Sequence, residues 1–154
     1  MVDIVDKKTR SRMMSGIRGK DTSPELLVRR FLHDAGFRYR LHVPHLPGKP
    51  DIVLPKYRAV VEVRGCFWHQ HAGCRYAYVP KSRPEFWLPK LRSNVLRDRR
   101  QSATLKQSGW RLFEVWECSL DPLLLKRLVR EIKRDPRKRS QKIATPLRSL
   151  KRRT

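Results

Sequence analysis

The chain lacks the features of a secreted or membrane protein. Its 154 residues include only three cysteines, and this odd number argues against a closed disulfide framework and for a reducing cytosol. No run approaches the roughly 18 apolar residues of a transmembrane helix. The stretch Met1–Asp6 has neither the basic nor the apolar region of a secretory signal. We therefore expect a cytoplasmic protein with no membrane partner.

Acidic residues are also scarce. The 14 Asp and Glu residues stand against 37 Lys and Arg, a net charge of +23. Such an excess requires a polyanionic partner, and nucleic acid is the first candidate because Lys and Arg neutralise phosphates and release counterions. An anionic membrane is the second, but no amphipathic anchor is visible. Charge alone does not separate an enzyme from a nucleic-acid binder.

The hydrophobic pattern predicts one α/β domain over residues 1–134, followed by a basic, flexible tail over 135–154. Thr22-Ser23-Pro24-Glu25 is a capping signature that opens a helix, and Pro89 should kink or split a later helix. The predicted order is a mixed central sheet with helices packed on it. We expect helices over 22–36, 82–108 and 122–133, strands over 37–43, 51–54, 59–64 and 110–116, and an irregular segment over 65–81.

Two acidic residues mark the ends of neighbouring strands. Asp51 begins one predicted strand, and Glu62 lies in the next, two residues before Arg64. A hairpin would bring the two carboxylates together, and strand alternation places Glu62 and Arg64 on one face. Paired carboxylates can hold Mg²⁺, which activates water, and a nearby cation can balance charge on a phosphate. The pattern is that of restriction-endonuclease-like nucleases, PD-(D/E)xK, with Arg for Lys; a turn Asp and a surface salt bridge is the ordinary alternative.

The cysteines group with one histidine. Cys66, His71, Cys74 and Cys118 match the three thiolates and one imidazole of a closed structural Zn²⁺ site. Three unrelated thiols and an exposed histidine are the alternative. A zinc ion would hold the irregular segment against the core.

Aromatic residues and a histidine lie beside the same cluster. Phe67, Trp68 and Trp87 could be core residues or wedges that enter the DNA stack. His69 is left over from the zinc set, and a histidine near the carboxylates could act as the general base; a satisfied polar histidine is the alternative.

Together these residues resemble a known family. The chain over about residues 6–120 is similar to the very-short-patch repair (Vsr) endonucleases. The motifs that carry the resemblance are Pro47-Gly48-x-Pro50-Asp51, Gly65-Cys66-Phe67-Trp68-His69-x-His71, Glu85-Phe86-Trp87-Leu88, Arg97-Asp98-Arg99-Arg100, Gly109-Trp110-Arg111 and Val115-Trp116-Glu117-Cys118, with Asp6-Lys7, Thr9-Arg10-Ser11 and Met14 upstream.

The resemblance implies a restriction-endonuclease-like fold and a DNA endonuclease that nicks one strand 5′ to the thymine of a T·G mismatch, the product of 5-methylcytosine deamination. It implies catalytic Mg²⁺ and structural Zn²⁺. Asp51 would be a magnesium ligand, His69 the base, and Glu25 a supporting acid. From the acidic pair itself we expect Glu62 and the Val63 carbonyl to be the other magnesium ligands. DNA contacts would come from Phe67, Trp68, Trp87, Arg10, Arg12, Met14, Lys90 and Asn94.

One departure from the family is important. Members of the family carry Thr-His before Gly-Cys-Phe-Trp, whereas this chain has Glu62-Val63-Arg64 there. We hypothesise that Glu62 restores a second metal ligand and that Arg64 acts electrostatically on the phosphate. We expect a monomer associated with the nucleoid, with mismatch-repair proteins as further partners. A non-catalytic zinc-containing DNA-binding protein, and a nuclease of the same fold with another DNA substrate, are the alternatives.

Overall fold

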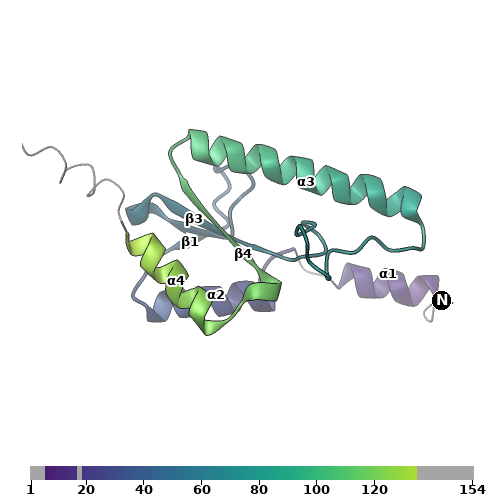
Figure 1. Ribbon diagram of the computed structural model, residues 1–154, viewed down its shortest axis with the longest axis horizontal. Helices are drawn as coiled ribbons and strands as arrows, with labels where there is room; N and C mark the ends of the chain where they lie inside the picture. The colour runs from purple at the N-terminus through teal and green to yellow at the C-terminus, as the bar shows by residue number, and fades with distance from the viewer. Residues whose placement is uncertain (1–5, 17–18, 135–154) are drawn as a thin grey trace, which may run out of the picture.

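A computed structural model of the chain describes residues 6–16 and 19–134 (Figure 1). The tail expected over 135–154 lies outside these residues. The elements follow the order α1 (Lys7–Ser15), α2 (Ser23–Asp34), β1 (Arg40–Leu41), β2 (Ile52–Leu54), β3 (Ala59–Arg64), α3 (Pro84–Gln107), β4 (Arg111–Trp116) and α4 (Pro122–Lys133), with short 3₁₀ helices at Pro55–Tyr57 and Glu117–Ser119. No helix in this part of the chain is long and apolar enough to cross a membrane.

The four strands form one mixed sheet in the order β1-β2-β3-β4. Strands β1, β2 and β3 are antiparallel neighbours, whereas β3 and β4 run parallel and are joined by the crossover through α3. The predicted mixed sheet with helices packed on it is therefore confirmed. The predicted hairpin is also confirmed, because Ile52 pairs with Val61 and Leu54 with Ala59.

Helices cover the two faces of the sheet in three layers, with α3 on one side and α2 and α4 on the other (Figure 1). Alternation along β3 explains this arrangement: Val61 and Val63 pack in the core with α2 and α4, while Val60 packs with Leu105 of α3 on the opposite face. Glu62 is two residues beyond Val60 in the strand, so its side chain lies on the same face of the sheet as that of Val60. The charged residues of β3 therefore lie on the face that α3 covers.

The predicted start of α2 is confirmed. The Thr22 hydroxyl accepts a hydrogen bond from the Glu25 amide, and Pro24 stands in the first turn. The Glu25 carboxylate in turn accepts from the Asp21 amide at 2.9 Å. Glu25 is thus part of the helix cap, as its capping signature predicts.

Three elements differ from expectation. The strand expected over 37–43 is reduced to β1, because His42 adopts a left-handed backbone conformation (φ 44°) that ends the extended run. Of the kink or split expected at Pro89, the split is wrong, since α3 is one helix of 24 residues. A proline near the helix start removes one amide donor but leaves the rest of the ladder. Helix α1 was not predicted, because its sequence has no apolar face at helical spacing.

Candidate active site

One row of polar residues crosses the end of the sheet: Glu62 and Glu114 lie in β3 and β4, and Asp51 and His42 lie one residue outside β2 and β1. Glu62 pairs with Glu114 across β3 and β4. One step beyond the β2–β3 pairs, the register sets Asp51 opposite Glu62, and one step beyond the β1–β2 pairs it sets His42 opposite Asp51. The His42 amide donates to the Asp51 carbonyl at 3.4 Å. Side chains of paired residues project to the same side of a sheet, so Asp51, Glu62 and Glu114 face the α3 layer. His42 is left-handed, and its ring contacts Arg29 and Glu25 of α2 instead.

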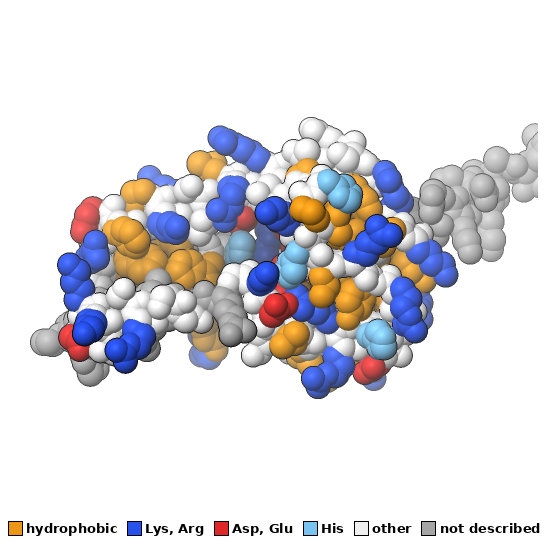
Figure 2. Space-filling view, turned by 180° about the vertical axis from the view of Figure 1, so that it is seen from behind, with side chains coloured by type: hydrophobic (Ala, Val, Ile, Leu, Met, Phe, Trp, Pro, Cys, Tyr) orange, Lys and Arg blue, Asp and Glu red, His pale blue; other side chains and the backbone are white. Residues whose placement is uncertain are grey.

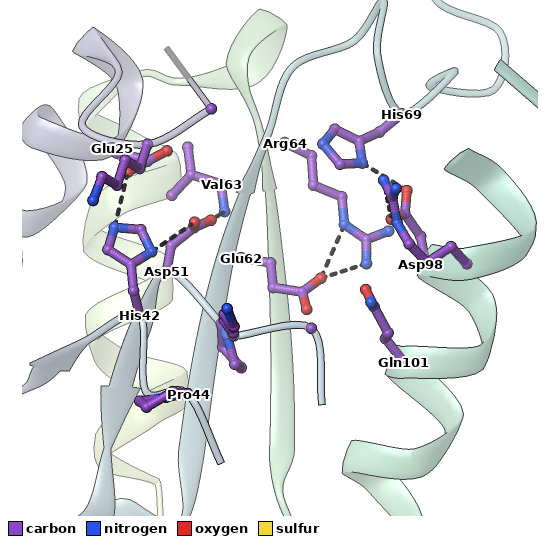
Figure 3. A pocket seen from close by; sticks show the side chains of 16 residues that line it. Glu25, His42, Pro44, Asp51, Glu62, Val63, Arg64, His69, Asp98 and Gln101 are labelled. Carbon is purple, nitrogen blue, oxygen red and sulfur yellow. Dashed lines mark hydrogen bonds and ion pairs between the residues drawn. The ribbon is translucent and has the colours of Figure 1, made fainter. Parts of the chain in front are cut away.

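A pocket of about 650 Å³ opens over this row (Figure 3). The end of β3 forms its floor, and the segment before α2, the turn after β1 and the face of α3 form its walls. Its charged and histidine lining residues are Lys20, Glu25, His42, Lys49, Asp51, Glu62, Arg64, His69, Arg97 and Asp98. The structure thus brings together Asp51, Glu62, Arg64, His69 and Glu25, which the sequence analysis named as one site.

Asp51 is held in place by the strand that follows it. Its Oδ2 accepts a hydrogen bond from the Val63 amide at 2.8 Å. Burial raises the pKa of the Asp51 carboxyl to about 6; the Val63 hydrogen bond opposes this rise, and the charges of Glu25 and Glu62 add to it. Three carboxylates around one pocket repel each other, so a cation between them would be stabilised.

Glu62 is tied to Arg64. Its Oε2 accepts from the Arg64 Nε at 3.0 Å and from the Arg64 Nη2, while the Arg64 Nη1 lies 3.1 Å from Glu114 Oε1. The same Nη2 donates to the Ser102 hydroxyl of α3 at 3.1 Å. The Arg64 side chain is 10% exposed. Arg64 therefore links β3, β4 and α3 and fixes the Glu62 carboxylate at the pocket wall.

His69 is oriented by an acidic residue of α3. Its Nδ1 lies 2.6 Å from Asp98 Oδ2, and Asp98 is buried (Figure 3). An ionised carboxylate only accepts hydrogen bonds, so the proton of a neutral His69 ring resides on Nδ1. The Nε2 lone pair is then free to accept a proton, which is the state that a general base requires.

The three cysteines and His71 meet beside the pocket. Their Sγ and ring nitrogen atoms all lie within 4.8 Å of one another, with His71 Nδ1 at 3.3 Å from Cys118 Sγ and 3.6 Å from Cys66 Sγ. Burial raises the pKa of the Cys66 thiol to about 12. His71 stacks on Trp116 with centroids 4.1 Å apart. The set can hold a metal ion, because three thiolates and an imidazole are a tetrahedral donor set.

Phe67, Trp68 and Trp87 form one aromatic cluster. The ring centroids of Phe67 lie 5.1 Å from Trp68 and 5.5 Å from Trp87, and the two tryptophans are 6.0 Å apart. All three side chains are only partly buried. Tyr78 and Phe86, both largely exposed, extend the cluster. These aromatics are therefore not a sealed core.

The other residues expected to contact DNA are more dispersed. Lys90 and Arg12 are exposed on α3 and α1. Asn94 is buried, and its amide donates to the Trp68 carbonyl at 3.1 Å, so it supports the aromatic cluster. The side chains of Arg10 and Met14 lie outside the described residues.

Sequence reasoning gave no role to Asp98 and His42, which contact the predicted site residues. Asp98 is an acid inside a run of arginines in a long helix, and that isolation was the available signal. His42 gave no sequence signal, because its role depends on where β1 ends. Its ring faces Glu25 on one side and Asp51 on the other (Figure 3).

Basic side chains surround this chemistry. Figure 2 shows Lys and Arg distributed over one face of the molecule, with histidine and acidic side chains around a hollow near its middle. Arg92, Arg97 and Arg100 line a second, shallower pocket on α3. The surface therefore presents positive charge around a small acidic centre, an arrangement suited to a phosphate polymer.

Comparisons with known proteins identify the family of this chain. Residues 2–75 match the family described as DNA mismatch endonuclease Vsr. The chain is 48% identical over 123 residues to the type II nicking enzyme V.XorIIP of Xanthomonas oryzae pv. oryzae, an alignment that covers 80% of this chain and 90% of that protein. It is 46% identical to the type II nicking enzyme V.NmeAIP of Neisseria meningitidis over 86% of this chain and 98% of that protein, and 45% identical to the DNA mismatch endonuclease Vsr of Escherichia coli over 78% and 76%. The chain belongs to the Vsr family of DNA mismatch endonucleases.

Proposed function

We propose that this protein nicks one strand of duplex DNA 5′ to the thymine of a T·G mismatch, in the repair of deaminated 5-methylcytosine. The observation that carries the proposal is the pocket shared by Asp51, Glu62 and His69 on an otherwise basic surface. The names of its relatives, a mismatch endonuclease and type II nicking enzymes, support the same activity. A single active site suffices for a nick in one strand, so the working unit is a monomer.

The acidic end of the pocket would hold Mg²⁺. Asp51, Glu62 and the Val63 carbonyl offer the oxygen donors that this ion prefers. Burial and the charges of Glu25 and Glu62 raise the pKa of Asp51, so a bound cation would stabilise its ionised form. When bound, Mg²⁺ supplies positive charge that lowers the pKa of a water molecule and shields the scissile phosphate. Glu25 would support this centre from the pocket wall.

His69 would take the proton of the attacking water at Nε2. The bond between His69 Nδ1 and Asp98 keeps Nε2 unprotonated and stabilises the charged ring that forms when Nε2 takes the proton. Asp98 is therefore a positioning residue. Arg64 would hold Glu62 in place through its paired contacts and place positive charge beside the phosphate. This arrangement would take the place of the histidine that precedes Gly-Cys-Phe-Trp in the best-known members of the family.

DNA binding would draw on the aromatic cluster and the basic surface. Phe67, Trp68 and Trp87 are partly exposed and close enough to enter the base stack as one wedge, at a cost of a few kcal/mol of unstacking. Lys90 would reach the bases, and Asn94 would act through the Trp68 carbonyl that it binds. Arg10, Arg12 and Met14 would lie along the minor groove.

The Cys66, His71, Cys74 and Cys118 site would hold structural Zn²⁺. Four donors within 4.8 Å fill a tetrahedral coordination sphere and leave no position for substrate. The ion would fix the loop that carries Phe67, Trp68 and His69. The fold around the zinc site is proposed to be restriction-endonuclease-like. The basic tail beyond residue 134 would be an additional contact to DNA. The protein would work at the nucleoid and together with mismatch-repair proteins.

The test is a nicking assay on labelled duplexes. A T·G duplex incubated with Mg²⁺ should give one nick 5′ to the mismatched thymine, and neither a matched duplex nor a reaction with EDTA should give one. Binding without a nick would favour the non-catalytic DNA-binding protein. Equal cutting of the matched duplex would favour a nuclease with another substrate.

The Glu62→Gln variant tests the acidic centre. Glutamine preserves shape but removes the charge, so nicking should fall by about a hundredfold while DNA affinity stays within about twofold. Undiminished nicking by this variant would show that Glu62 is not a metal ligand.

A further inference from the structure

His42 stands between two carboxylates of the pocket. Its Nδ1 lies 3.8 Å from Asp51 Oδ1, and its Nε2 lies 3.8 Å from Glu25 Oε2 (Figure 3). The residue has φ 44°, a left-handed conformation that is uncommon outside glycine, although asparagine, aspartate and histidine adopt it more often than other residues. Such strain tends to persist where the surroundings hold a functional group in place.

Arg29 determines which nitrogen of His42 carries the proton. The Arg29 Nη2 lies 3.0 Å from His42 Nε2. A guanidinium can only donate hydrogen bonds, so Nε2 must present its lone pair and the ring proton must be on Nδ1. Arg29 is itself buried and cannot turn away, because it also binds Asp21 at 2.6 Å and Glu25 at 2.9 Å.

With the proton on Nδ1, the N–H dipole of His42 lies 3.8 Å from Asp51 Oδ1, a distance beyond a direct hydrogen bond, while the Val63 amide donates to Asp51 Oδ2 at 2.8 Å. Resting on the function proposed above, we propose that His42 is a positioning residue that holds the Asp51 carboxylate in the orientation that binds the divalent ion. Arg29 sets the tautomer of His42. Glu25 of α2 contacts the other ring nitrogen of His42, so the contacts run from Glu25 through His42 to Asp51. Groups that orient a metal ligand in this way commonly change metal affinity about 10-fold to 100-fold when they are removed.

A pair of variants separates this role from backbone strain. His42→Gly and His42→Asn both tolerate the left-handed conformation, since glycine and asparagine adopt it most readily. They differ in the donor, because the asparagine amide lies near the place of the ring Nδ1 and glycine has no side chain. Thermal unfolding of both variants monitors folding independently.

The readout is Mn²⁺ binding to zinc-loaded, DNA-free protein, followed by electron paramagnetic resonance. His42→Gly should weaken Mn²⁺ binding about tenfold, and His42→Asn should stay within about threefold of the parent protein. In nitrogen-15 spectra of histidine-labelled protein, His42 should show the Nδ1–H tautomer. Mn²⁺ binding by His42→Gly equal to that of the parent, or an Nε2–H tautomer, would overturn the proposal.

Asp51→Asn serves as the reference that distinguishes failure of the metal site from failure of the proposed role of His42. It should abolish the Mn²⁺ site. If it does so while His42→Gly binds normally, the metal site stands and the role of His42 is refuted. If Asp51→Asn binds Mn²⁺ as tightly as the parent, the metal site itself fails and the role of His42 fails with it.

Discussion

Replacing Asp51 with asparagine should stabilise the protein at neutral pH and abolish nicking. Burial raises the pKa of the Asp51 carboxyl to about 6, from its ordinary value of 3.8. The folded protein thus binds this proton more tightly than the unfolded chain. Protonated Asp51 therefore contributes to the free energy of unfolding at low pH, and this contribution is lost as pH rises from about 4 to about 6. Above that range, the folded protein without Mg²⁺ carries the full cost of an ionised Asp51.

The pKa difference sets the size of the effect. At about 1.36 kcal/mol per pKa unit, the shift corresponds to roughly 3 kcal/mol. An asparagine is neutral, and its Oδ1 can still accept from the Val63 amide. Its amide group would face the Nδ1–H of His42, which reduces the gain. We expect Asp51→Asn to raise the free energy of unfolding by about 1–3 kcal/mol at about pH 7.5.

The measurement is urea unfolding without added Mg²⁺, at two pH values. The calculated ionisation cost falls from about 3 kcal/mol at about pH 7.5 to about 1 kcal/mol at about pH 4.5, so the stabilisation should shrink accordingly. Asp34→Asn is the matched control, because Asp34 is exposed and its replacement should change stability by less than about 0.5 kcal/mol. Nicking by Asp51→Asn should fall about a hundredfold or more. An equal change in stability at both pH values would refute the reasoning.

Three further predictions concern other parts of the site. Asp98→Asn should slow single-turnover nicking by about 10²–10⁴-fold with unchanged DNA affinity by fluorescence anisotropy, because an amide no longer enforces the His69 tautomer; a normal rate would exclude a positioning role. Cys118→Ser should release zinc to a chromogenic chelator and lower the melting temperature, and retention of a full equivalent would contradict the proposed ligand set. Gly48→Ala should destabilise by about 1–3 kcal/mol, since φ is 74° and a Cβ would meet a glutamine oxygen of α3 at 2.7 Å. Gly36→Ala is its control, with a similar φ of 89° and open space, and an equal loss in calorimetry would show that crowding contributes nothing.

The sequence by itself determined the local features. Alternation over Ala59–Arg64 set which side chains enter the core and which face α3, and the Thr22 signature located the start of α2. The spacing of Asp51 and Glu62 was enough to predict that a hairpin places them at one end of the sheet. The cysteines and His71 could be grouped because their donor chemistry allows few alternatives. These features depend on hydrophobic periodicity and on the geometry of residues close in sequence, and both can be read from the sequence.

Only the tertiary structure decided which groups meet across the chain. Asp98 reaches His69, and Ser102 reaches Arg64, because α3 returns over the sheet before β4 pairs with β3. His42 reaches Asp51 because β1 ends at a left-handed residue. The partners of His69 and Arg64 lie 29 and 38 residues away. Contacts at such separation depend on how elements pack and in which register strands pair, and a one-residue slip would move every side chain of the row to the other face.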